Sequence, residues 1–324
     1  MDAPELVDAL LAGNRRALAR AITHVEADSA IGREVLRRIY PQTGRAQTVG
    51  ITGSAGAGKS TLVGALAREE RARGRSVGIV AVDPSSPFSH GAILGDRIRM
   101  QDLTSDPGVF LRSMASRGNL GGLSETATGV VDLMDAAGHD VVFIETVGAG
   151  QDEVEVATTA QTTVLVANPG AGDEVQSMKA GLMEIAQIMV VNKADLAGAD
   201  TAAAQLRALL AIANLGAWTP PILMAVARAN EGIVEVVDAI DEHQAHMRSD
   251  EYGAAERDRH VRGQIIALAR AALHREALEA AEASGALDAL TAEVAARRRD
   301  PRSAALELLD SLREQWASSV EPKP

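Results

Sequence analysis

Hydrophobic positions recur along the first forty residues at the spacing of amphipathic helices. Leucine, isoleucine and valine stand about three, four or seven positions apart, with arginine and glutamate between them, at Leu6, Leu10, Leu18, Ile22, Val35 and Ile39. This spacing gives each helix one apolar stripe. The segment Tyr40–Gly44 contains a proline and a glycine, which end the pattern. We therefore expect an N-terminal helical segment over residues 1–45.

From there to about residue 240, short apolar segments alternate with helical stretches. The apolar segments are rich in β-branched residues, and they are Gln47–Thr52, Ser76–Asp83, Val109–Met114, Asp140–Thr146, Thr162–Asn168, Gln187–Asn192 and Pro221–Val226. Several are almost wholly apolar rather than alternating, as in strands of a sheet that is covered on both faces. Alternation of strand and helix favours an α/β domain over residues 46–240, with a doubly wound and mostly parallel sheet.

Strand patterns stop at about residue 241. Residues 256–317 are rich in Ala, Leu, Glu and Arg at helical spacing, with interruptions near Ser284-Gly285 and Asp300-Pro301. Because this tail has no β-layer of its own, we expect residues 241–324 to form a helical arm that packs on the main domain or on a second copy of it. The basic run Arg297–Arg299 is interpreted as a solvated helix end rather than a contact for an acidic partner.

Composition narrows the possible functions. The 324 residues include 32 Lys plus Arg and 44 Asp plus Glu, a net charge of −12, which argues against a general nucleic-acid binder. The absence of cysteine excludes disulfides, thiolate metal sites and cysteine nucleophiles. No apolar run approaches the roughly 20 residues that span a bilayer, and the N-terminus resembles no signal peptide. We therefore expect a cytoplasmic protein without a membrane partner.

Histidine adds no candidate metal site. The seven histidines include one pair at helical spacing, His243 and His246. We expect this pair to be exposed on a helix, and we assign it no role.

Residues 53–60 read Gly-Ser-Ala-Gly-Ala-Gly-Lys-Ser, which matches the P-loop pattern. The loop follows an apolar strand and opens the predicted helix Thr61–Arg73, and this context disfavours the alternative of an ordinary glycine-rich turn. Backbone N–H groups converge on phosphate in such a loop, and the helix N-terminus adds partial positive charge. Lys59 is expected to reach the β- and γ-phosphates and Ser60 to bind Mg²⁺. The phosphate-binding residues are predicted to be Gly53, Ser54, Ala55, Gly56, Ala57, Gly58, Lys59, Ser60 and Thr61.

A second motif, Asn192-Lys193-Ala194-Asp195, follows an apolar strand, and ligands lie at the carboxyl edge of a parallel sheet. The Asp195 carboxylate can accept hydrogen bonds from N1–H and the exocyclic amino group of guanine. Adenine presents an acceptor at N1, and an unpaired buried acceptor costs about 1–3 kcal/mol. The motif therefore predicts GTP rather than ATP, with Asn192 tying this loop to the P-loop and the Lys193 stem covering the base.

Two more strands end in carboxylates. Asp83 ends one, and Glu145 ends another, three positions before Gly148. Either acid alone could be a solvated strand end, but beside a P-loop they are candidate magnesium ligands, and the Gly148 N–H can sense a γ-phosphate. No glutamine directly follows Gly148, although Gln151 is near, so we expect slow intrinsic hydrolysis.

These motifs closely resemble the MeaB/ArgK family of P-loop GTPases over most of residues 10–245. The stretches that carry the resemblance are residues 53–61, 82–89, 91–100, 145–151 and 169–176, and Glu145 is regular for this family. One departure concerns the Ser-Ala signature behind the base, which here reads Ala225-Val226-Ala227. We still expect backbone contacts to the base from Val226 and Ala227.

The resemblance implies a homodimeric chaperone of an adenosylcobalamin-dependent acyl-CoA mutase. Such proteins use GTP binding and hydrolysis to gate cofactor delivery and to protect or reactivate the mutase. It also implies a phosphate–magnesium site made of Lys59, Ser60, Asp83, Asp96 and Glu145, and dimerisation through the helical tail. A mobile element within 170–179 would relay the nucleotide state through Asp173, Glu174, Gln176 and Lys179.

Three other functions fit the motifs less well. A metallochaperone GTPase for nickel enzymes normally needs Cys or His clusters for its cargo, and this chain has no cysteine. A P-loop small-molecule kinase would need a pocket for the substrate that accepts the phosphate. In such an enzyme the Asn-Lys-x-Asp motif would occur by chance. A transport ATPase implies ATP preference and membrane association, which Asp195 and the absence of a membrane segment oppose.

Overall fold

The computed structural model describes residues 1–84, 101–116, 122–146, 159–169, 185–212, 217–249 and 253–320. The chain divides into two compact units, Met1–Ile265 and Ile266–Pro324. The first unit contains the sheet and the second is helical.

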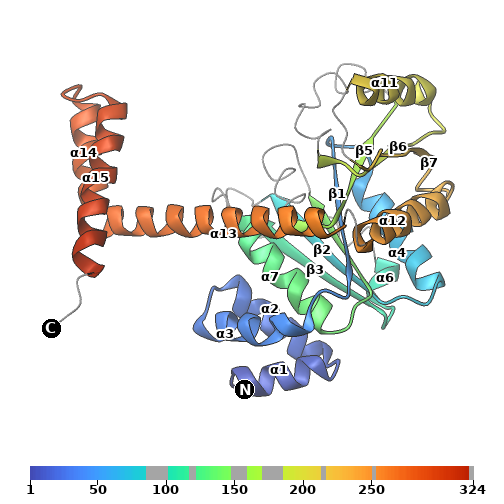
Figure 1. Ribbon diagram of the computed structural model, residues 1–324, viewed down its shortest axis with the longest axis horizontal. Coiled ribbons are helices and arrows are strands. Elements are labelled where there is room, and N and C mark those ends of the chain that lie inside the picture. The colour runs from blue at the N-terminus through green and yellow to red at the C-terminus, as the bar shows by residue number, and fades with distance from the viewer. Residues whose placement is uncertain are drawn as a thin grey trace. The chain divides into compact units, whose positions relative to one another are not determined.

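The sheet has seven strands in the order β3-β2-β4-β1-β5-β6-β7, and all neighbours in it are parallel (Figure 1). The strands are β1 (Gln47–Gly53), β2 (Val77–Pro84), β3 (Val109–Ser116), β4 (Val141–Thr146), β5 (Thr162–Ala167), β6 (Ile188–Asn192) and β7 (Ile222–Ala225). Each of the seven predicted strands is present with ends within two residues of the prediction. The predicted α/β class with a parallel, doubly wound sheet is therefore confirmed.

Helices cover both faces of this sheet (Figure 1). One face packs on α4 (Lys59–Ala72) and α12 (Ile233–Arg248). The other packs on α7 (Gly122–Ala136) and the N-terminal helices, and on α11 (Ala199–Ile212) beside β5 and β6. Along β4, Val141 and Phe143 belong to the first core and Val142 and Ile144 to the second. Burial of both faces explains why the strands are continuously apolar.

The N-terminal layer consists of α1 (Ala3–Leu11), α2 (Arg15–Glu26) and α3 (Ala30–Ile39), followed by the 3-10 turn η1 (Tyr40–Gln42). Asp2, Asn14 and Ser29 cap these helices, because their side-chain oxygens accept backbone N–H groups of the first turn. The predicted apolar stripe is buried, since none of its members is more than 2% exposed: Leu6, Leu10, Leu18, Ile22, Val35 and Ile39.

A buried carboxylate fixes the entry into β1. Asp135 on α7 accepts hydrogen bonds from the backbone N–H groups of Gly44 at 2.6 Å, Arg45 at 3.2 Å and Ala46 at 3.0 Å. Asp135 is 6% exposed, so its charge is compensated mainly by these donors. This contact anchors the strand that leads directly into the P-loop.

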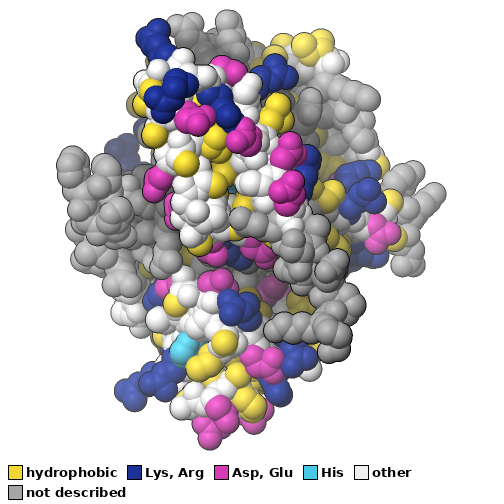
Figure 2. All heavy atoms as spheres, turned by 90° about the vertical axis from the view of Figure 1, so that its left-hand side faces the viewer, with side chains coloured by type: hydrophobic (Ala, Val, Ile, Leu, Met, Phe, Trp, Pro, Cys, Tyr) yellow, Lys and Arg dark blue, Asp and Glu magenta, His cyan; other side chains and the backbone are white. Residues whose placement is uncertain are grey.

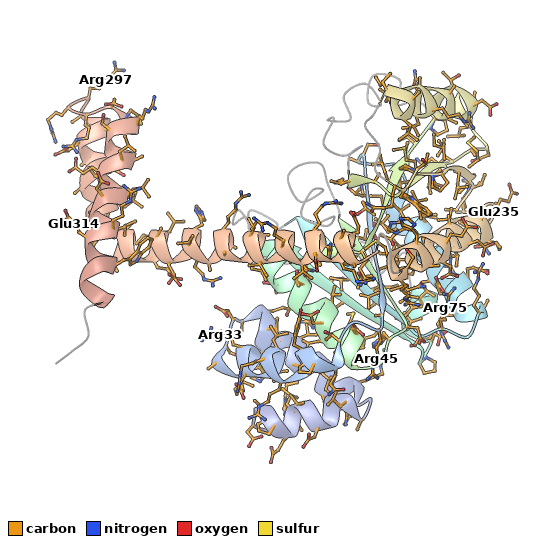
Figure 3. All side chains as sticks on the ribbon, in the orientation of Figure 1. Arg33, Arg45, Arg75, Glu235, Arg297 and Glu314 are labelled. Carbon is orange, nitrogen blue, oxygen red and sulfur yellow. The ribbon has the colours of Figure 1, made fainter. Side chains whose placement is uncertain are left out.

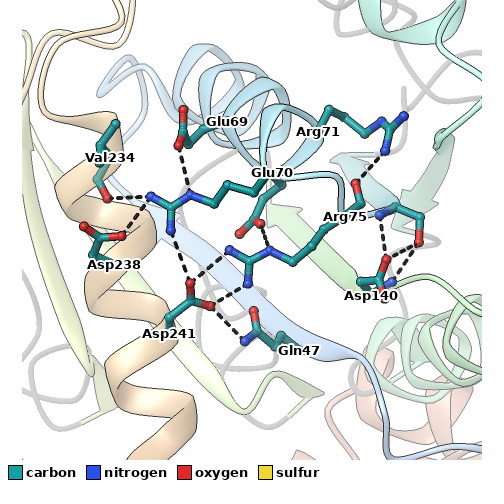
Figure 4. A network of polar contacts seen from close by, with 11 residues as sticks. Gln47, Glu69, Glu70, Arg71, Arg75, Asp140, Val234, Asp238 and Asp241 are labelled. Atoms are coloured by element: carbon teal, nitrogen blue, oxygen red, sulfur yellow. Dashed lines mark hydrogen bonds and ion pairs between the residues drawn. The ribbon is translucent and has the colours of Figure 1, made fainter.

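An ion-pair network joins α4, the segment that links α4 to β2, and α12 near the amino ends of the strands (Figure 4). Arg75 pairs with Asp241 at 2.7 Å and with Glu70 at 2.6 Å, while Arg73 pairs with Glu69 at 2.9 Å and Asp238 at 2.8 Å. The network lies at the end of the sheet opposite the P-loop, so its contribution is to packing.

The C-terminal part of the chain forms three helices, α13 (Gly253–Ala283), α14 (Ala286–Ala295) and α15 (Pro301–Val320). A short helix of the first unit, α6 (Gln101–Thr104), is a single turn before β3. The breaks between the three C-terminal helices fall where the sequence predicts, because Gly285, with φ 70°, is the N-cap residue of α14 and Pro301 is the first residue of α15. Arg297 lies at the turn between α14 and α15, and its side chain points away from both helices (Figure 3). Arg299 pairs with Glu293 at 3.0 Å. Across the described residues, no helix combines the length and the apolar character that a membrane crossing requires.

Candidate functional site

The loop between β1 and α4 requires glycine at specific positions. Gly53, Gly56 and Gly58 have φ of 135°, 76° and 90°. A Cβ on Gly53 would lie 2.1 Å from the carbonyl oxygen of Val166, and one on Gly58 would lie 2.5 Å from Nδ2 of Asn192. Close approach of the neighbouring backbone and side chain, together with positive φ, therefore explains the glycines of the loop.

Lys59 lies across this loop. Its Nζ donates hydrogen bonds to the carbonyl oxygens of Gly53 at 2.5 Å and Ser54 at 3.1 Å, and the residue is 6% exposed. The N-cap residue of α4 is Gly58, which has no side chain of its own to cap the helix. The ammonium group and the first amides of α4 thus lie at one loop, and this combination binds phosphate.

The predicted magnesium ligands Ser60 and Glu145 are in direct contact. The Ser60 hydroxyl donates a hydrogen bond to Oε1 of Glu145 at 2.6 Å, and the two residues are 8% and 1% exposed. They meet because β4 pairs with β1 and brings Glu145 level with Ile51. Hydroxyl and carboxylate oxygens are the donors that Mg²⁺ prefers, so these two residues fit that ion.

Asn192 joins the end of β6 to the P-loop, as predicted. Its Nδ2 donates to the carbonyl oxygens of Ala57 at 2.9 Å and Gly58 at 3.4 Å, and its Oδ1 accepts from the N–H of Ala227 at 3.2 Å. Only 2% of Asn192 is exposed. One buried amide therefore holds together the P-loop, the β6 loop and the loop after β7.

Lys193 adds a second link between the same loops. It has a φ of 56°, an uncommon value for a residue with a side chain, and its Nζ donates to the carbonyl oxygen of Gly56 at 2.8 Å. Its stem thereby bridges from the β6 loop to the P-loop.

Asp195, the predicted base-reading acid, lies beyond this joint and is partly open to solvent. Its side chain is 38% exposed, and its Oδ2 accepts a hydrogen bond from Nη2 of Arg228 at 3.4 Å. Asp195 also lines a small pocket of about 230 Å³ with Ala194, Met224, Ala225, Val226, Glu231 and Gly232.

The loop after β7 is tightly closed. The backbones of Val226 and Glu231 exchange hydrogen bonds of 3.0 and 3.3 Å. Gly232 follows with φ 74°, and a Cβ there would lie 2.2 Å from the carbonyl oxygen of Met224. This closure fixes where Val226, Ala227 and Arg228 stand relative to the β6 loop.

Several predicted site residues lie outside the described part of the chain, and their roles stay predictions. They are Asp96, Gly148, Asp173, Glu174, Gln176 and Lys179, together with the side chain of Asp83. The backbone of Asp83 lies one residue before the end of β2, at the same edge as Glu145, because Ala81 pairs with Glu145. Sequence reasoning did not single out Arg228, and the only signal for it is its place directly after Ala227.

The predicted exposure of the histidine pair is wrong for His243, which is 3% exposed. Its Nδ1 lies 2.8 Å from the Thr162 hydroxyl, and Trp218 packs edge-on against its ring with centroids 4.9 Å apart. Burial lowers the pKa of His243 to about 4. The reason is that α12 turns this residue toward β5. Within the described ranges, no three His, Cys, Asp or Glu side chains group to hold a metal.

A parallel sheet with a glycine-rich phosphate loop, a serine–glutamate pair and a joined Asn-Lys-x-Asp loop defines a P-loop protein of the GTPase class. The sequence profile described as "Methylmalonyl Co-A mutase-associated GTPase MeaB" matches residues 18–282. The chain belongs to the MeaB family of GTPases.

Individual relatives agree with this assignment. A protein of Pyrococcus abyssi named as a GTPase is 46% identical over 93% of this chain and 94% of its own. The GTPase ArgK of Escherichia coli is 39% identical over 73% of this chain and 74% of its own. The mouse "Methylmalonic aciduria type A homolog, mitochondrial" is 34% identical over 78% of this chain and 65% of its own.

A solved structure shares the fold. The crystal structure titled "LAO/AO transport system kinase" superposes with a TM-score of 0.72 at 27% identity, covering 96% of this chain and 97% of that one.

Proposed function

We propose that the protein binds GTP and hydrolyses it slowly to GDP and phosphate. The observation that carries the proposal is the Asn192 side chain, whose hydrogen bonds to Ala57 and Ala227 join the phosphate loop to the loops around Asp195. One nucleotide can therefore contact both, with its phosphates on residues 53–61 and its base against Asp195. Lys193, Val226 and Ala227 would border the base.

Magnesium fits the same proposal. Ser60 and Glu145 would hold the ion, with Asp83 and Asp96 as further candidates, and Mg²⁺ would neutralise charge on the phosphates. The Lys59 ammonium would leave the carbonyl oxygens of Gly53 and Ser54 for the phosphates, and Gly148 would approach the γ-phosphate.

Phosphate release from GTP tests this activity. The wild-type protein should release phosphate from GTP and not from ATP, and Lys59→Ala should abolish release while the protein stays folded. The matched control is Lys193→Ala, since Lys193 lies beside the base rather than the phosphates. This variant should weaken nucleotide binding but still release phosphate when GTP is saturating. Release from ATP equal to that from GTP would contradict the proposal.

For the partner, we propose an adenosylcobalamin-dependent acyl-CoA mutase, whose cofactor loading the GTPase gates and which it protects or reactivates. Support comes from the family description, which names methylmalonyl-CoA mutase, and from the name of the mouse relative. Asp173, Glu174, Gln176 and Lys179 are proposed to relay the nucleotide state. The cytoplasmic location stays a prediction.

Capture from native lysate on immobilised protein tests the partner. The captured fraction should contain a cobalamin-dependent mutase, in amounts that differ between GTP, GDP and no nucleotide. Lys59→Ala should lose the difference between GTP and no nucleotide. Equal capture in all three states would contradict a nucleotide-gated chaperone.

We further propose a homodimer formed through the C-terminal helices. Five large apolar residues of α13 are 40–61% exposed, namely Val261, Ile265, Ile266, Leu273 and Leu278. Figure 2 shows hydrophobic side chains at the surface among charged ones. A contiguous patch of exposed apolar side chains marks an association surface, and we propose that these residues contribute to one. Light scattering should give a dimer for the wild type and a monomer for Ile265→Asp, whereas the exposed control Glu279→Gln should remain dimeric.

A further inference from the structure

We propose that Arg228 is a positioning residue that sets the orientation of the Asp195 carboxylate and so sharpens the choice of purine. The inference rests on the proposed binding of guanine nucleotides. Its basis is the hydrogen bond of 3.4 Å between Nη2 of Arg228 and Oδ2 of Asp195, two residues on separate loops.

The position of Arg228 is fixed by its neighbours. Ala227, directly before it, is 5% exposed and donates its N–H to Asn192 at 3.2 Å. On the other side, the loop is closed by the paired backbones of Val226 and Glu231. The Arg228 side chain therefore starts from an anchored backbone although 84% of it is exposed.

The sequence explains why this contact matters here. Val226, which lines the same small pocket as Asp195, has no hydroxyl to offer its carboxylate. Among the described residues, Arg228 supplies the side-chain hydrogen bond to the Asp195 carboxylate.

Orientation of a carboxylate affects guanine and hypoxanthine differently. The last torsion of an aspartate side chain is broad, so an unrestrained carboxylate rotates. Either oxygen can accept N1–H, which both bases have. The second hydrogen bond, from the exocyclic amino group that only guanine has, needs both oxygens in the plane of the base. A contact that restrains one oxygen therefore favours GDP over IDP.

The test is the ratio of the dissociation constants of IDP and GDP, measured by calorimetry on the full-length protein. In Arg228→Ala this ratio should fall by about 2- to 5-fold, which is the range for an exposed ion pair. Arg228→Lys should recover part of it, because the charge remains. Arg207→Ala, an exposed arginine on α11, should leave it unchanged.

Salt gives a second readout that a merely structural role would not move. Ions screen exposed pairs, so the ratio should fall with added salt in the wild type and change less in Arg228→Ala. If Arg228→Ala left the ratio of the two dissociation constants unchanged, even with both nucleotides bound more or less tightly by the same factor, the inference would be overturned. The proposed binding of GTP would still stand. Absence of GDP binding by the wild type would instead overturn the proposed function, and the inference with it.

Discussion

The side-chain amide of Asn192 donates a hydrogen bond of 2.9 Å to the carbonyl oxygen of Ala57, across 135 positions of sequence. This contact joins the tip of β6 to the phosphate loop after β1. The same side chain accepts the N–H of Ala227, so all three loops of the proposed nucleotide site depend on it.

Replacing this amide should therefore affect stability and nucleotide binding together. Asn192→Ala leaves the buried Ala227 N–H without its acceptor, and each such group costs about 1–3 kcal/mol. We expect the free energy of unfolding to fall by about 2–3 kcal/mol and GDP binding to weaken more than tenfold, as measured by urea unfolding and calorimetry.

The control is Asn230→Gly, in an exposed position of the loop after β7 with φ 62°, where glycine fits without strain. This variant should retain both properties. Unchanged GDP binding in Asn192→Ala would show that the nucleotide site does not depend on the hydrogen bonds of Asn192.

Asp195→Asn tests which purine the carboxylate reads. The amide would present a donor where guanine also has a donor, whereas xanthine has a carbonyl oxygen at that position. We expect GDP binding to weaken by about 10- to 100-fold, since hydrogen bonds to charged groups contribute about 1.5–3 kcal/mol, and xanthosine diphosphate to bind better than it does to the wild type. Asp200→Asn, on the first turn of α11, should change neither affinity. If Asp195→Asn bound GDP as tightly as the wild type does, Asp195 would not be the residue that recognises the guanine base.

Two aspartates on α7 should respond in opposite ways to the same substitution. Burial, with the nearby charge of Asp135, raises the pKa of Asp132 to about 7. The native state then keeps this proton to higher pH than the unfolded state does, so stability falls as pH rises from about 4 to 7. Asp132→Asn should stabilise the protein at pH 8 by about 1–2 kcal/mol after allowance for partial exposure, and thermal unfolding at pH 5 and 8 measures this.

Asp135→Asn should instead destabilise the protein at both pH values. Its carboxylate accepts three backbone N–H groups before β1, and a neutral amide accepts them less strongly. If both substitutions lowered stability at pH 8, burial of an ionised Asp132 would not be costly.

Acid should destabilise the protein through His243. Its pKa is lowered to about 4 from 6.5 by burial, so below pH 6.5 the unfolded state binds a proton that the native state does not. Stability is therefore lost as pH falls from 6.5 to 4, by at most about 3 kcal/mol. Urea unfolding followed by the fluorescence of Trp218, whose ring lies against His243, should show this slope.

His243→Asn should remove this loss of stability between pH 6.5 and 4. The test is the difference in the free energy of unfolding between the variant and the wild type at each pH. The exposed His274→Asn, on α13, should leave the profile parallel to that of the wild type. A parallel profile for His243→Asn would mean that the native protein accommodates the charged ring.

The sequence was sufficient for those features that rest on local patterns. Continuous apolar runs predicted all seven strands because the sheet is buried on both faces, and the P-loop and Asn192 followed from motifs with fixed geometry. Three features depend instead on how distant segments meet. Arg228 reaches Asp195 only because the loop after β7 closes, and His243 is buried because α12 turns it toward β5 and Trp218. Arg75, between α4 and β2, meets Asp241 on α12, which is distant in the sequence.

In the proposed complex, the phosphate loop and Asp195 bind the two ends of one guanine nucleotide. The decisive measurement is calorimetric titration of the wild-type protein with GTP and with ATP, each in the presence of Mg²⁺. We expect saturable binding of GTP, at least about tenfold tighter than that of ATP, because ATP would lose a hydrogen bond between its base and Asp195. No heat of binding with GTP, or equal affinity for ATP, would contradict it.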